Sequence, residues 1–251
     1  MKNKSSKSII SKLLFLVFVL LSFWGCSSKE TNSAIIPTNK LDHSWWKERH
    51  ERVIDSLTTN PELILIGNSI LHTLDYKDRN VVWTKYLNKY HTLNMGFSGD
   101  RTENVIWRLQ NGELKNISPK VALVLIGTNN TDGNNFPTIN YPNELEEATW
   151  KICKIIREKL PKTEILLLGM LPFGKHIPNF RNTINKETNK LISKFPNSDN
   201  HIHYIDIGDI YLDSDGKIIK EIMPDRLHPN AEGHMMMFGE LESEIYKLMN
   251  K

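Results

Sequence analysis

Cysteine is scarce in this chain of 251 residues, which contains only Cys26 and Cys153. At most one disulfide can form within the chain, and none if Cys26 is modified, so the fold cannot depend on a disulfide framework. Cys153 lies in the apolar run 150–156 and is predicted to be a buried thiol on a helix face. Internal repeats are also missing, which excludes repeat architectures.

Long hydrophobic runs are limited to residues 13–21, a stretch too short for a mature membrane-spanning helix. Four lysines precede this run and Gly25-Cys26 follows it, which is the order of groups in an export signal. The pattern resembles a bacterial lipoprotein signal, in which residues 1–25 are removed and Cys26 carries the lipid. We therefore expect an exported, membrane-anchored protein with residues 26–42 as a flexible tether. Ordinary secretion with a chance cysteine is the alternative.

A strong excess of either charge is absent as well. The full chain has 32 basic and 29 acidic residues, but four of its lysines lie in the predicted signal. From Cys26 onward the chain has 28 basic and 29 acidic residues, which gives a net charge of −1. This balance gives no electrostatic support for a nucleic-acid partner.

Short apolar runs alternate with amphipathic stretches through the rest of the chain. The runs have the length and composition of strands buried on both faces of a parallel sheet. We predict strands at 63–66, 91–95, 121–126, 165–168 and 202–207, and helices at 45–57, 103–110, 143–159, 182–195 and 230–249. The alternation predicts a single three-layer α/β domain over residues 43–251, with right-handed crossovers.

Four short motifs supply the groups that ester hydrolysis needs. Ser69, Gly99 and Asn129 each follow a predicted strand, and the carboxyl ends of parallel strands meet at one edge of the sheet. Ser69 is the candidate nucleophile. Its backbone N–H, together with Gly99 and Asn129, is a candidate donor of an oxyanion hole. Asp225 and His228 are the candidate orienting carboxylate and base.

Each of these residues alone has an ordinary explanation. Serine is a preferred helix N-cap, asparagine suits tight turns, and an aspartate and a histidine three residues apart are often solvated loop residues. The order of the four motifs along the chain is what favours a catalytic site.

The motifs at 67–69, 96–100, 127–130 and 225–228 resemble the four conserved blocks of the SGNH (GDSL-type) hydrolases. Residues 93–114 are especially similar to the catalytic subunits of platelet-activating-factor acetylhydrolases, and the resemblance covers residues 63–248. It implies a flavodoxin-like fold with five parallel strands and no metal or organic cofactor. The roles that it implies are a nucleophile, two oxyanion donors and an acid–base pair, namely Ser69, Gly99, Asn129, Asp225 and His228.

Asn68 departs from the family pattern, which usually has aspartate before the nucleophile. The amide keeps hydrogen-bonding capacity and loses the charge, so loss of activity does not follow from this change.

Two other patterns carry less weight. Residues 169–175 resemble a phosphate-binding loop in sequence. However, His176 occupies the position at which Ser or Thr would bind magnesium, and Pro172 removes a backbone donor. Asp225, His228 and His234 have no recognised zinc spacing, so we predict no metal site.

The sequence thus predicts a serine esterase that removes short acyl groups, with acetyl as the first expectation, through an acyl-enzyme. O-acetyl groups of glycans are the expected substrate, on the basis of compartment and family analogy. A lysophospholipase or other lipid esterase is the alternative among enzymes. A carbohydrate-binding protein without turnover is the alternative of another class, motivated by Asn68.

The tandem Trp45-Trp46 is expected to be buried under the first helix rather than to line the acceptor surface.

Overall fold

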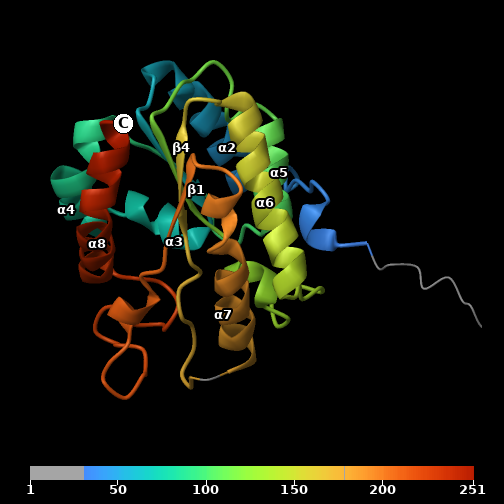
Figure 1. The fold of residues 1–251 in the computed structure, drawn as a ribbon, viewed down its shortest axis with the longest axis vertical. Coiled ribbons are helices and arrows are strands. Elements are labelled where there is room, and N and C mark those ends of the chain that lie inside the picture. Colours follow the sequence, from blue (N-terminus) through green and yellow to red (C-terminus); the bar gives the residue numbers. More distant parts are fainter. Residues whose placement is uncertain (1–30, 178) are drawn as a thin grey trace, which may run out of the picture. The chain divides into compact units, whose positions relative to one another are not determined.

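Five parallel strands form the central sheet of the computed structural model, which describes residues 31–177 and 179–251 (Figure 1). The strands are β1 (Leu63–Gly67), β2 (Leu93–Gly96), β3 (Val121–Leu125), β4 (Glu164–Leu168) and β5 (Ile202–Ile205). Their order in the sheet is β2-β1-β3-β4-β5. This is the doubly wound order of flavodoxin-like proteins, and it confirms the predicted fold class.

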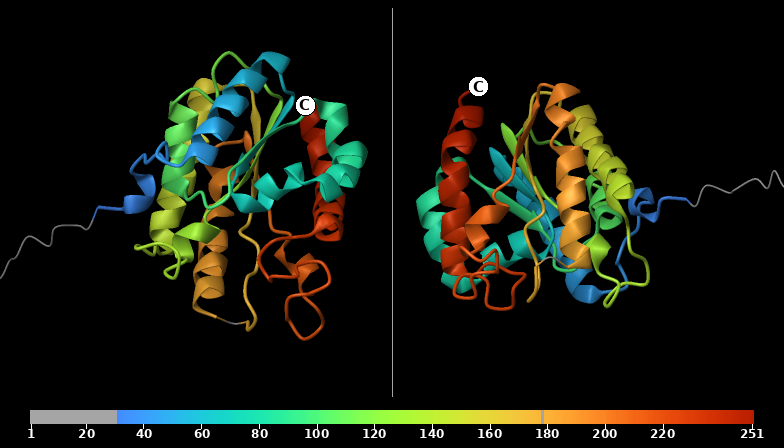
Figure 2. Two further views of the ribbon diagram at one scale, coloured as in Figure 1. Left: turned by 180° about the vertical axis from the view of Figure 1, so that it is seen from behind. Right: turned by 60° about the horizontal axis from the view of Figure 1, so that its bottom comes forward.

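Helices cover both faces of the sheet. They are α2 (Ser44–Ser56), α3 (Ser69–His72), α4 (Asn80–Val82), α5 (Thr102–Gln110), α6 (Pro142–Lys159), α7 (Phe180–Ile192) and α8 (Ala231–Met249). One face is covered by α2, α5 and α6, with α7 beside α6, and the other is covered by α4 and α8 (Figures 1 and 2). The three layers therefore match the sequence-based expectation.

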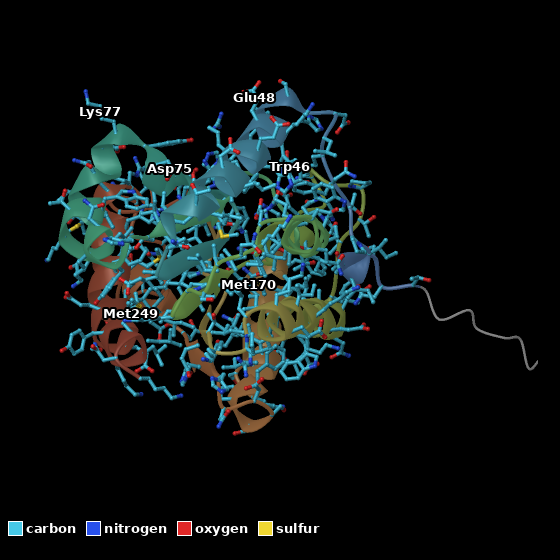
Figure 3. All side chains as sticks on the ribbon, turned by 90° about the horizontal axis from the view of Figure 1, so that it is seen from above. Trp46, Glu48, Asp75, Lys77, Met170 and Met249 are labelled. Carbon is cyan, nitrogen blue, oxygen red and sulfur yellow. The ribbon has the colours of Figure 1, made fainter. Side chains whose placement is uncertain are left out.

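Alternate residues along β1, β3 and β4 supply two separate cores. In β1, Ile64 and Ile66 pack with side chains of α2, α5 and α6, whereas Leu63 and Leu65 pack with those of α4 and α8. Figure 3 looks at this arrangement from above, with Trp46 of α2 on one side of the sheet and Met249 of α8 on the other. The near-continuous apolar runs are explained because both faces of the strands are covered.

Side-chain caps fix where the later helices begin. The Glu144 carboxylate accepts the N–H of Tyr141 at 2.8 Å, just before Pro142 opens α6. The Asn179 side chain accepts the N–H of Asn182 at 3.0 Å, so α7 begins two residues before the predicted position.

Residues 32–42 pack on the domain, so the prediction of a flexible tether over 26–42 is wrong for this part of the segment. Ala34 is fully buried, and its carbonyl oxygen accepts the Thr102 hydroxyl at 2.9 Å. The Asn32 amide donates to the carbonyl of Glu144 at 3.0 Å. The polar composition suggested solvation, but these groups bond to α5 and α6 instead.

The compact unit accordingly begins at residue 32 rather than at 43. The predicted signal peptide at 1–25 and the predicted lipidation site at Cys26 lie outside the described residues. Within residues 31–177 and 179–251, no helix combines the length and the apolar character needed to cross a membrane.

Candidate active site

The sheet topology brings three of the candidate residues together. Ser69 is the first residue of α3, directly after β1, while Gly99 follows β2 and Asn129 follows β3. Because β1 lies between β2 and β3, Ser69 stands between the other two residues at the carboxyl edge. This is also the point at which the strand order reverses, which is the usual position of a ligand site in open α/β sheets.

Ser69, His228 and Asp225 form one chain of hydrogen bonds. The Ser69 Oγ lies 2.8 Å from His228 Nε2, and His228 Nδ1 lies 2.6 Å from Asp225 Oδ2. The carboxylate of Asp225 can only accept when it is ionised, so it favours the imidazole tautomer that is protonated at Nδ1. His228 Nε2 is then free to accept the proton of Ser69, which is the arrangement of a serine hydrolase triad.

The loop that holds Asp225 and His228 folds around the carboxylate. Asp225 Oδ1 accepts the N–H of Leu227 at 3.0 Å and the N–H of His228 at 2.8 Å. Partial burial acts to raise the pKa of Asp225, but the hydrogen bonds from the His228 ring and backbone outweigh it and hold this pKa below its usual value. The carboxylate is therefore ionised at neutral pH.

A tight turn places Gly99 at the cleft beside Ser69. The Asp100 N–H donates to the carbonyl of Phe97 at 3.1 Å, and Gly99 has a φ of +74° at the third position of this turn. A positive φ at that position is typical of a type II turn and favours glycine. A side chain at Gly99 would disfavour this backbone conformation.

Asn129 and Asn130 have different surroundings. Asn129 lines the cleft, and its side-chain Nδ2 donates to the carbonyl of Asp100 at 2.8 Å, which leaves a second N–H of the amide for a ligand. Asn130 is fully buried, where its Nδ2 donates to Glu103 and Asn140, each at 3.0 Å. The first asparagine thus suits an oxyanion donor, and the second holds the loop.

Asn68, rather than Ser69, is the N-cap of α3. Its side-chain Oδ1 accepts the N–H of Ile70 at 3.0 Å, and aspartate could accept the same bond. The Asn68 Nδ2 is buried and has no hydrogen-bond partner among the described residues. The interpretation of Ser69 as a capping serine is therefore wrong, since its hydroxyl bonds to His228 instead.

A second serine–histidine pair lies beside the cleft and was not expected from the sequence. His72 Nδ1 lies 2.8 Å from the Ser98 Oγ and accepts the Ser98 N–H at 3.2 Å. Burial lowers the pKa of His72 to about 4, so this imidazole is a weak base. We interpret the pair as a link between α3 and the turn of residues 97–100, which we call the oxyanion turn because of the role predicted for Gly99. No motif indicates it, because the two residues are 26 positions apart.

The expected burial of the tandem tryptophans is confirmed for Trp46 and is wrong for Trp45. Trp46 is fully buried and its indole N–H donates to Asp100 at 2.8 Å, as the expectation of burial requires. Trp45 is 42% exposed and stacks on His72 with ring centroids 6.1 Å apart.

Residues 169–175 and His234, which belong to the two weaker patterns, are not part of the site. After Lys175, four residues pass before α7 begins at Phe180, whereas a phosphate-binding loop runs directly into its helix. His234 is fully buried, and its Nε2 lies 2.8 Å from the carbonyl of Ile70, which joins α8 to α3. Across the described part of the chain, we find no group of three or more His, Cys, Asp or Glu side chains that could hold a metal ion.

We expect His234 to make stability depend on pH. Burial lowers its pKa in the folded protein to about 4, against 6.5 without burial, so protons bind more tightly to the unfolded chain. The contribution of neutral His234 to the free energy of unfolding is therefore complete above pH 6.5. As the pH falls from 6.5 toward 4, the free energy of unfolding should decrease by roughly 3 kcal/mol. Urea unfolding at several pH values should show this fall. H234Q should flatten the curve in that window, and parallel curves for the two proteins would contradict the assignment.

Comparison with known proteins agrees with this geometry. A sequence model of the GDSL-like Lipase/Acylhydrolase family matches residues 65–236. The chain belongs to this family. Platelet-activating factor acetylhydrolase IB subunit alpha1 of Homo sapiens is 31% identical over 229 residues, which cover 88% of this chain and 93% of the human protein. The predicted resemblance to SGNH hydrolases is thereby confirmed.

Solved structures share the fold of this GDSL-like acylhydrolase. A GDSL-like lipase from Bacteroides thetaiotaomicron aligns with a TM-score of 0.61 and 18% identity, over 80% of this chain and 97% of the lipase. A catalytic mutant of an acetylxylan esterase from Geobacillus stearothermophilus aligns with a TM-score of 0.57 and 13% identity, over 76% and 94% of the two chains. The family membership and the sequence relatives make this protein a carboxylic-ester hydrolase.

Proposed function

We propose that this esterase removes acetyl and other short acyl groups from carbohydrates through an acyl-enzyme on Ser69. The supporting observation is the hydrogen-bonded chain from Asp225 through His228 to Ser69, whose three residues line a cleft of about 610 Å³. Part of the proposal is export of the protein, with a lipid on Cys26 holding it at a membrane.

The proposed reaction has two halves. Ser69 Oγ attacks the ester carbonyl carbon as its proton passes to His228 Nε2, and the carbonyl oxygen becomes an oxyanion between the N–H groups of Ser69, Gly99 and Asn129. His228 then returns the proton to the leaving alcohol, and the acyl group remains on the serine. Water attacks the acyl-enzyme in the same way, with His228 again as the base, and releases the acid.

Aliphatic side chains are few in the cleft, which favours a short acyl group over a long one even though most of the exposed lining surface is apolar. Among the described residues that line it, Leu227 and Pro224 are the only aliphatic ones. The remaining lining side chains are mainly polar or charged, namely Ser69, Thr73, Arg79, Ser98, Asn129, Asp132, Asn135, Asp225, His228 and Asn230. A long acyl chain needs a continuous apolar wall, whereas hydroxyl-rich acceptors use polar partners of this kind.

Two exposed aromatic rings at the same cleft support a sugar acceptor. Tyr76 is 52% exposed and Phe136 is partly exposed, and both line the cleft. Flat rings of this kind can pack against the C–H face of a sugar while Asp132 and Asn135 bind hydroxyl groups. The relatives support the acetyl part of the proposal, because their names describe an acetylhydrolase and an acetylxylan esterase.

Acetyl esters should be cleaved faster than octanoyl esters. With residues 27–251 as the enzyme, we expect kcat/KM for p-nitrophenyl acetate to exceed that for the octanoate by about tenfold or more, since an octanoyl chain would leave apolar surface exposed to water. Acetylated xylo-oligosaccharide and a lysophospholipid should then be compared by acid release. Preference for octanoate and the lysophospholipid would replace the proposal by a lipid esterase, and binding of the saccharide without acid release would indicate a protein that only binds.

A further inference from the structure

Lys40 reaches from the N-terminal segment to the oxyanion turn. Its Nζ donates to the carbonyl oxygen of Gly99 at 2.7 Å and lies 3.5 Å from Asp100 Oδ1. The side chain is only 22% exposed. We find no other donor to the Gly99 carbonyl among the described residues. The hydrogen bond is charge-assisted, so it is stronger than one from a neutral donor.

We propose that Lys40 is a positioning residue of the oxyanion hole, which holds Gly99 so that its N–H faces the developing oxyanion. The inference rests on the proposed function, because it assumes that Gly99 is one of the oxyanion donors. Lys40 itself does not touch the reacting atoms in this assignment. It acts through the backbone of Gly99, because a glycine has no side chain that could anchor it.

The rest of the turn is fixed on both sides of Gly99. Ser98 before it is held by His72 of α3, through the two hydrogen bonds to the imidazole. Asp100 after it is fully buried and accepts the indole N–H of Trp46 and the Nε–H of Arg108, each at 2.8 Å. Gly99 lies between these two fixed points in a conformation that other residues rarely adopt, so its own restraint comes from Lys40.

The segment that carries Lys40 is itself anchored. The Thr38 N–H donates to the carbonyl of Glu103 at 3.1 Å, and the Thr38 carbonyl accepts the Asn104 side-chain amide at 2.9 Å. On the other side, the Lys40 carbonyl accepts the N–H of His43, immediately before α2 begins. The ammonium group is therefore delivered to Gly99 from a segment fixed at both ends.

The nearby charges keep the ammonium group in place. Burial lowers the pKa of Lys40, and the Asp100 carboxylate opposes this effect. Without the cation, the Gly99 carbonyl would lose its partner and the turn could relax away from the geometry that aims the Gly99 N–H. Since an oxyanion donor acts in the transition state more than on the bound ester, the loss should appear in kcat rather than in KM.

The test compares K40M, K40R and the control K47M. Met keeps most of the length and removes the donor, and Arg restores a cation. Lys47 is 56% exposed on α2 and lies 4.0 Å from Glu51. We expect K40M to lower kcat for p-nitrophenyl acetate by about 10- to 100-fold with KM within about threefold. K40R should recover most of kcat, and K47M should match the parent. Unfolding temperatures of all four proteins should be recorded alongside.

Three results would overturn the inference: an unchanged kcat in K40M, a rise in KM without a fall in kcat, or a fall in kcat that follows a lowered unfolding temperature and is not recovered by K40R. The rate at which a fluorophosphonate modifies Ser69 provides a second measurement, because its phosphoryl oxygen uses the same donors. This rate should fall in K40M even if the parent proves inactive on acetyl esters. An inactive parent would therefore contradict the proposed substrate class, whereas an unchanged fluorophosphonate rate in K40M would contradict the role of Lys40.

Discussion

Replacing Ser69 by alanine is expected to lower kcat for acetyl ester hydrolysis by at least about 1000-fold. The substitution removes the hydroxyl that we propose forms the acyl-enzyme and leaves His228 without the serine proton to accept. Among the described residues, the Ser69 hydroxyl bonds only to His228, so the unfolding temperature should stay close to that of the parent. Steady-state kinetics with p-nitrophenyl acetate would measure the loss.

Ser98→Ala is the matched control for this experiment. Ser98 also bonds to a histidine at the same cleft, but its partner His72 has a pKa lowered to about 4 by burial and cannot serve as an effective base at neutral pH. We expect S98A to lower kcat by less than about tenfold, through a looser oxyanion turn. If S98A were inactive and S69A retained activity, the nucleophile would be Ser98 and the assignment would be reversed.

Replacing Arg108 by methionine is expected to lower the free energy of unfolding by about 3–5 kcal/mol. Arg108 is fully buried and bridges two fully buried carboxylates: its Nε donates to Asp100 at 2.8 Å, and its Nη1 donates to Glu113. Its Nη2 also donates to the carbonyl of Met95 at 3.2 Å, at the end of β2. Methionine would leave both carboxylates without their shared cation in a region that water does not reach. Urea unfolding at pH 7 would measure the change.

Arg52→Met is the corresponding control on an exposed ion pair. Arg52 lies 3.8 Å from Glu48 on α2, and both side chains are more than 60% exposed. Such pairs contribute little, so the cost should stay below about 0.5 kcal/mol. Equal costs for R52M and R108M would mean that the buried network does not stabilise the fold as argued.

The sheet could be predicted because its strands are buried on both faces. Runs such as 121–126 are apolar at every position, and their spacing leaves room for one helix between each pair of strands. The segment between β1 and β2 could not be predicted in this way. Its residues 73–90 form a series of short helical turns, which are too short to show a helical period in the sequence.

The packing of residues 32–42 was missed for a related reason. This segment contributes Ala34 to the interior and otherwise attaches through polar groups, such as Asn32 and Lys40. Composition indicates whether a segment can bury apolar surface, but it does not show which distant carbonyl oxygens its polar groups will reach. The same limit hid the role of Lys40 at the oxyanion turn.

The candidate site could be predicted because its residues lie in motifs at strand ends. Ser69 and Asn129 follow apolar runs directly, and the spacing of Asp225 and His228 lets a single loop join them. The supporting contacts could not be predicted. The link from His72 to Ser98 joins separate segments, and only the fold shows that they meet.

The central claim is that Ser69 is the nucleophile activated by His228. The most direct measurement is intact-protein and peptide mass spectrometry after reaction of residues 27–251 with a fluorophosphonate, in parallel with His228→Ala. We predict one adduct per chain, located on Ser69, and an adduct rate that falls by at least about 100-fold in the variant. An adduct on Ser98 or on another serine, or equal rates in the two proteins, would contradict the claim.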